Sequence, residues 1–175
     1  MILIAGKNDC AESRKAWPEI VWAEISTQLN ILRRLVHRGG YDAVEFIVDI
    51  GESGALEPRW TDLDAAEAIG PGAAGMAPVL VCLTRKPDGD DILSFQEDGR
   101  EITNAQACLT VAENVATFIA AERGDAKMDA VHLTIGTGRN ALDVEIEADG
   151  ILETWTAPNM RRAQDDATPA GGPEI

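Results

Sequence analysis

Acidic and apolar residues alternate over residues 141–149, and this is the pattern in the chain with the clearest chemical meaning. Every second position holds a carboxylate: Asp143, Glu145, Glu147 and Asp149. Side chains two residues apart on a β-strand share a face at a spacing of roughly 7 Å, so the pattern predicts a strand with a row of carboxylates. Glu45 and Asp49, on an earlier predicted strand, are expected beside this row across the sheet.

Two interpretations of the row remain open. It is either a solvated outer face that also discourages aggregation, or a surface that binds a basic partner. The net charge of the chain is −15, from 30 acidic and 15 basic residues. Residues 1–40 hold six basic and four acidic residues, a charge of +2, so the remaining residues carry −17. Such acidity disfavours nucleic acid and anionic membranes as partners, because phosphate binding needs clustered lysine and arginine. It favours a basic protein.

Two glycine-rich segments were considered as nucleotide sites, and one acidic loop as a metal site. Residues 136–141 match GxGxx[GA], but a dinucleotide fingerprint must open a helix, and here a strand pattern follows. Gly70–Gly75 lacks the Gly-Lys-Ser/Thr ending of a phosphate-binding loop. Asp88–Asp91 lacks the remaining ligands of a calcium loop and is interpreted as an acidic turn. No cofactor and no metal are therefore expected.

Candidate catalytic side chains are few and dispersed. His37 and His132 are the only histidines; the first is expected in a last helical turn and the second on the solvent side of a strand. The three cysteines form no CxxC pair and are expected to be reduced, which fits a cytoplasmic protein. No nucleophile-elbow motif is present, so the sequence predicts a binding protein rather than an enzyme. A dispersed catalytic site remains an alternative.

Two long helices are predicted from apolar residues that recur every three or four positions. The first, about 18–38, starts at Trp17-Pro18, presents an apolar stripe (Trp22, Ile25, Leu29, Leu32 and Val36), and ends at Gly39-Gly40. The second, about 104–123, follows a capping box at Thr103 and ends at Gly124. A short helix is expected within 62–69.

The remaining elements are predicted strands. They cover 42–50, 59–61, 78–84, 91–96, 129–135 and 141–149, and 151–155 extends the sheet. The fold class that follows is α+β, with one antiparallel sheet and both long helices packed on one face. Residues 1–160 are expected to form a single domain and 161–175 a polar, partly disordered tail. No signal peptide or membrane-spanning stretch is recognised.

A faint internal echo accompanies this order of elements. A helix, a glycine and Asp42-Ala43-Val44 recur as a helix, a glycine and Asp129-Ala130-Val131. Each triplet opens a strand that ends in Ile-Gly. An ancient duplication explains the echo, and so do two α-β-β units that obey the same folding rules.

The order of elements resembles the YezG-like family of bacterial immunity proteins, small acidic α+β antitoxins that neutralise secreted nuclease toxins. The resemblance is best from Pro78 to about Arg162, including the closing Glu153-Thr154-Trp155-Thr156-Ala157-Pro158. It rests on pattern rather than on a diagnostic motif, and it supplies no catalytic residues. The segment 62–78 is longer than the family pattern implies.

The leading functional expectation is therefore an immunity or antitoxin protein that binds a basic toxin through its acidic strand, and the resemblance implies that this toxin is a nuclease. An anti-defence or DNA-mimicking inhibitor, whose carboxylates imitate phosphates, is the runner-up. A small enzyme or ligand-binding domain with its site beside the 70–78 loop is the third possibility.

Overall fold

The computed structural model describes residues 11–70, 79–85, 91–97, 103–124, 126–138 and 141–158. The expected tail at 161–175, the acidic turn at 88–90 and most of the 70–78 loop lie outside these residues. Three helices are described: α1 (Ala11–Arg38), α2 (Leu63–Ile69) and α3 (Asn104–Arg123). The strands are β1 (Ala43–Ile50), β2 (Leu56–Trp60), β3 (Val79–Arg85), β4 (Asp91–Glu97), β5 (Ala130–Gly136), β6 (Leu142–Ala148) and β7 (Ile151–Trp155).

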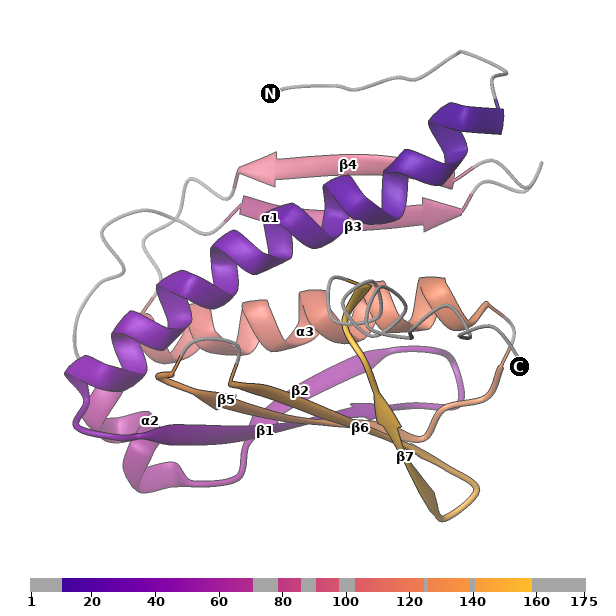
Figure 1. Ribbon diagram of the computed structural model, residues 1–175. Helices are drawn as coiled ribbons and strands as arrows, with labels where there is room; N and C mark the ends of the chain where they lie inside the picture. The colour runs from indigo at the N-terminus through magenta and orange to yellow at the C-terminus, as the bar shows by residue number, and fades with distance from the viewer. Residues whose placement is uncertain are drawn as a thin grey trace, which may run out of the picture.

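Five strands form one antiparallel sheet in the order β2-β1-β5-β6-β7. The two long helices, α1 and α3, run in opposite directions and pack on one face of this sheet (Figure 1). This confirms the predicted α+β class. We call the face under the helices the inner face and the opposite one the outer face.

Strands β3 and β4 correct the expectation of a single sheet. They pair only with each other among the described strands and form a separate two-stranded sheet. Strand β3 contacts α3 and α1, so the helices lie between this strand pair and the five-stranded sheet (Figure 1). A helix has two sides to cover, and the second strand pair covers the side that the main sheet does not reach.

Helix α1 begins earlier than predicted. It starts at Ala11, so Pro18 lies inside the helix rather than at its first turn. Proline removes one backbone hydrogen bond there, but alanine, glutamate, arginine and lysine dominate the preceding turns and have high helix propensity. The predicted apolar stripe from Trp22 to Val36 is buried, as expected from its spacing.

The core lies between the helices and the inner face. Strand β1 contributes Val44, Phe46 and Val48, and the rings of Phe46 and Trp60 lie 4.6 Å apart between centroids. A second aromatic cluster joins both helices to the sheet edge, because Trp22 of α1 contacts Phe118 of α3 and Trp155 of β7. Val44, Phe46 and Val48 all point to the inner face because successive side chains of a strand alternate between its two faces.

The helix ends match the predicted capping chemistry. The Thr103 side chain accepts a hydrogen bond from the Gln106 N–H, and α3 ends at Gly124, whose φ of 66° favours glycine. The short helix α2 is capped by Asp62, whose carboxylate accepts from the N–H groups of Asp64 and Ala65. Among the described residues, no helix combines the length and apolar character needed to cross a membrane.

One polar contact is buried between the helices. Asn114 of α3 donates from Nδ2 to Oε1 of Gln28 of α1 at 2.8 Å, and both side chains are buried. Removing one partner of a buried hydrogen bond costs about 1–3 kcal/mol, because the other group loses its compensation for desolvation. We expect Asn114→Ala to lower the free energy of unfolding by this amount in urea denaturation. Gln106→Ala, exposed on the same helix, should change it by less than about 0.5 kcal/mol. Equal losses of stability in the two variants would contradict a stabilising role for the buried hydrogen bond between Asn114 and Gln28.

Candidate functional site

The outer face of the five-stranded sheet gathers the carboxylates that the sequence singled out. Strand pairing places Glu45 of β1, Thr134 of β5 and Asp143 of β6 in one line across the sheet. Ile47, His132 and Glu145 form the next line, and Asp49, Ala130 and Glu147 form the third. Directly paired residues share a face, so all these side chains belong to the outer face.

Strand β5 separates the two groups of acids. Glu45 and Asp49 were expected to lie adjacent to the row on β6; they share its face, but β5 lies between. Two strand spacings amount to roughly 10 Å between the β1 and β6 backbones. The acids of β1 and the acids of β6 therefore lie on either side of β5, which carries His132 at its centre. His132 had been predicted on the side opposite the core, and the register confirms this.

The register adds two charged residues that sequence reasoning had missed. Glu57 of β2 lies opposite Asp49, and Arg59 lies opposite Ile47, so both belong to the outer face. The alternation of apolar and charged residues in Leu56–Trp60 puts Glu57 and Arg59 on one face of β2, and the register with β1 shows that this is the outer face. We define the acidic face by its six carboxylates: Glu45, Asp49, Glu57, Asp143, Glu145 and Glu147. Arg59 is the one arginine or lysine among these described outer-face positions of β1, β2, β5 and β6.

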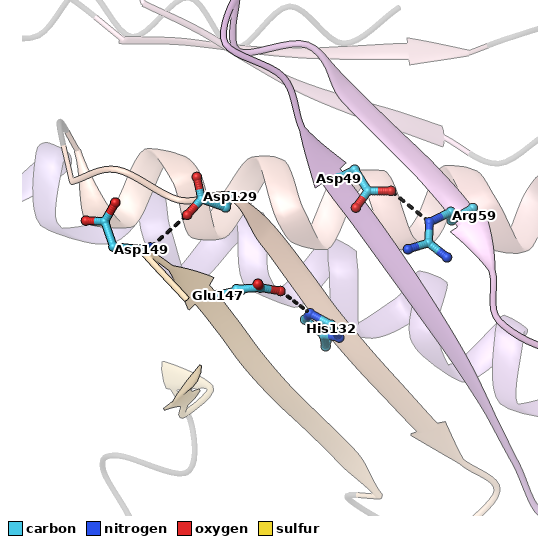
Figure 2. Close-up of polar contacts among 6 residues, drawn as sticks. All are labelled: Asp49, Arg59, Asp129, His132, Glu147 and Asp149. Atoms are coloured by element: carbon cyan, nitrogen blue, oxygen red, sulfur yellow. Dashed lines mark hydrogen bonds and ion pairs between the residues drawn. The ribbon is translucent and has the colours of Figure 1, made fainter. Parts of the chain in front are cut away.

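Two carboxylates of the acidic face contact an arginine or a histidine side chain. Arg59 Nε donates to Asp49 Oδ2 at 2.7 Å, and His132 Nε2 lies 3.0 Å from Glu147 Oε2 (Figure 2). Four exposed carboxylates have no ion pair with another described residue: Glu45, Glu57, Asp143 and Glu145. Three of these uncompensated charges lie at one end of β6 and on the facing end of β1, and Glu57 lies apart from them on β2.

Asp149 does not continue the row on β6. The strand ends at Ala148, and Asp149 adopts a φ of 52° in the turn to β7. Its N–H donates to Oδ2 of Asp129 at 2.7 Å (Figure 2). Its carboxylate accepts a hydrogen bond from Lys127 at 2.8 Å. The expected row of four is thus a row of three followed by a separate turn cluster. An aspartate tolerates this left-handed backbone region better than most residues, which explains the departure.

The turn cluster predicts a specific response to acid. The pKa of Asp129 lies below its ordinary value of 3.8, first because of the hydrogen bond from the Asp149 N–H and then because of Lys127. Because the pKa of Asp129 is lower in the folded chain than in the unfolded chain, the ionised carboxylate stabilises the fold at pH values above the unfolded-state pKa. This contribution to stability is lost as the pH falls through the folded-state pKa. We expect the Asp149 amide resonance to titrate below pH 3.8. In Lys127→Met the midpoint should rise. A midpoint above 3.8 in the unmodified chain would contradict the geometry.

Three nucleophilic or histidine side chains of the described residues belong to three different elements. Cys108 of α3 is buried, and desolvation raises its pKa to about 12, so its thiol stays protonated at neutral pH. His37 is exposed at the end of α1, whereas His132 belongs to the acidic face. The described residues contain no group of three histidine, cysteine or acidic side chains placed to hold a metal ion.

An open hollow of about 420 Å³ lies where the end of α3 meets β6 and β7. Its lining residues are Glu122, Arg123, Ile146, Thr154, Trp155 and Thr156. Two side-chain contacts involve its lining residues. Trp155 Nε1 donates to Glu122 Oε2 at 2.7 Å, and Arg123 pairs with Glu153 at 3.1 Å. These contacts connect α3 to the sheet and position no nucleophile.

Comparison of the chain with protein-family models, curated proteins and solved structures finds no match.

Proposed function

We propose that this chain is an immunity or antitoxin protein that neutralises a basic nuclease toxin by direct binding through its acidic face. The acidic face carries this proposal: six carboxylates are opposed by one arginine, and four of the six form no ion pair with described residues. Enzymes that bind phosphate are basic around the active site, so an acidic surface complements them. No catalytic group is needed for such inhibition.

The arrangement of charge also suits rapid capture. Exposed carboxylates of one sign create a field that attracts a basic protein and raises the association rate by about 10- to 1,000-fold. Speed matters for an inhibitor, because a free nuclease acts on its substrate before it is bound. Residues 41–175 carry a net charge of −17, which includes the acidic face and extends the field beyond it.

The proposal is tested by capturing binding partners from an extract of the source organism and then assaying whether the chain inhibits the captured protein. The full chain serves as bait beside a version with Asp143→Lys and Glu145→Lys. We expect the unmodified bait alone to capture a basic protein, and the purified partner to lose nuclease activity on plasmid DNA when one equivalent of the chain is added. Capture by both baits alike, or a partner with unchanged activity, would contradict the proposal. A DNA-binding partner without nuclease activity would instead indicate a DNA-mimicking inhibitor.

A further inference from the structure

The two edges of the five-stranded sheet differ in their ability to accept another strand. At the β2 edge, Thr61 N–H donates to Glu45 O and Gly51 N–H donates to Ala55 O, so odd-numbered residues of β1 direct their backbone groups toward β2. Pro58 lies opposite Val48, between those hydrogen-bonded positions, so its nitrogen faces the free edge. Proline has no N–H to donate, and this blocks strand addition at β2.

The β7 edge has the opposite character. Asp149 and Gly150 form a two-residue turn with φ values of 52° and 76°, which is typical of a type I′ hairpin. Ala148 and Ile151 then form a hydrogen-bonded pair, and the alternation along the strands directs the N–H and C=O groups of Leu152 and Thr154 away from β6. Among the described strands, none pairs with this side of β7.

Strand β7 has little of the usual protection of an edge strand. Natural sheets shield edges with proline, charged residues (especially lysine) or a bulge, and Ile151–Trp155 contains neither proline nor lysine. Its one charged residue, Glu153, pairs with Arg123 of α3 at 3.1 Å. Its first two residues are instead large and apolar, with Ile151 63% and Leu152 55% exposed. Such exposure of an open edge carries a risk of aggregation, so a binding role is the more economical explanation.

Charge on the neighbouring strand limits what can bind there. Thr154 lies opposite Glu145 and Leu152 lies opposite Glu147, so these β7 side chains share the acidic face. A strand added beside β7 would place every second side chain on that face, roughly 10 Å from the β6 backbone. Lysine or arginine at those positions extends over Thr154 toward Glu145. A second copy of the chain would instead bring two acidic faces together, each molecule carrying −15.

We propose that the β7 edge binds an extended segment of the partner by strand addition, and that this segment carries lysine or arginine at alternate positions. Backbone hydrogen bonds to Leu152 and Thr154 supply the affinity, and Glu145 selects the basic side chains. The inference rests on the proposed function only in assuming a basic partner. It specifies how that partner docks.

The test uses a blocked octapeptide that alternates lysine with threonine, added to the full-length ¹⁵N-labelled chain at low ionic strength. We expect saturable shifts of the amide resonances of Leu152 and Thr154. Thr154→Pro, which copies the protection that Pro58 gives to β2, should weaken binding by about tenfold or more. Glu145→Lys should also weaken it, and a glutamate–threonine peptide should not bind. The same peptide with N-methyl groups on alternate amides tests the hydrogen bonds without altering the protein.

Several results would overturn the inference. Shifts confined to β1 and β6, insensitive to Thr154→Pro and to N-methylation, would mean that basic segments bind the acidic face without strand addition; the proposed function would then stand. Self-association of the chain that Thr154→Pro abolishes would assign the edge to a second copy. Absence of peptide binding would remove the edge inference alone, because capture and inhibition of a toxin are measured independently.

Discussion

Replacing both Asp143 and Glu145 with lysine is expected to slow association with the basic partner by about tenfold or more at low ionic strength. Both side chains are exposed, and neither forms an ion pair with a described residue, so their charge acts on an approaching protein without local compensation. Glu147 is a weaker choice than the sequence suggested, because His132 lies 3.0 Å from its carboxylate. Stopped-flow association rates measured across salt concentration provide the test. The slope against ionic strength should flatten in the variant.

A matched control separates local from global charge. Glu24 of α1 and Glu67 of α2 are exposed and lie outside the acidic face, and reversing both changes the net charge by the same amount. The control should keep most of the association rate, and both variants should unfold within about 0.5 kcal/mol per substitution of the unmodified chain. If the two double variants slow association equally, the acidic face is only a solvated surface and the total charge alone matters.

Truncating Phe46 to alanine is expected to cost about 3–5 kcal/mol of folding stability, a large part of what a domain of this size possesses. Phe46 is fully buried at the centre of β1 and contacts Trp60. Its removal forfeits transfer free energy and leaves a cavity between the sheet and the helices, which a rigid sheet cannot close. Guanidinium denaturation followed by tryptophan fluorescence measures the loss.

The neighbouring residue Ile47 is the control for this substitution. It lies on the same strand but on the outer face, where its side chain is only half-buried. Ile47→Ala should cost about 1 kcal/mol or less, because little apolar area returns to water. Similar losses for both variants would show that the outer face is packed against another element and does not bind a partner in the manner proposed.

Periodicity was sufficient to predict the elements that carry a strong one-sided pattern. The apolar stripe of α1 and the alternation of β1 and β6 each predict which face of the element is buried. The predicted faces are buried in the structure. Capping chemistry set the ends of α3, because the Thr103 side chain and Gly124 satisfy local requirements. Such signals depend on neighbours in sequence, so no tertiary information is needed to recognise them.

Strand register and sheet membership required the structure. The residues of β3 and β4 do not indicate that these strands form a separate sheet, because a strand has the same backbone hydrogen-bonding groups whichever sheet it joins. Glu57 and Arg59 join the acidic face only through their pairing with β1. Asp149 fits the alternation perfectly in sequence, yet the turn to β7 takes it out of the row. Turn geometry overrides periodicity at the end of a strand.

The pairing of β1 with β5 has a consequence for the symmetry of the molecule. Phe46 and Leu133 lie directly opposite each other, and each stands four residues beyond the aspartate of its Asp-Ala-Val triplet. A half-turn about an axis through this pair therefore exchanges the two strands, and the helices that precede them, α1 and α3, run in opposite directions (Figure 1). The centre of the sheet has the geometry of an isologous dimer interface contained within one chain. Within the five-stranded sheet, β7 has no counterpart beyond β2, so it is the strand that departs from this twofold relation.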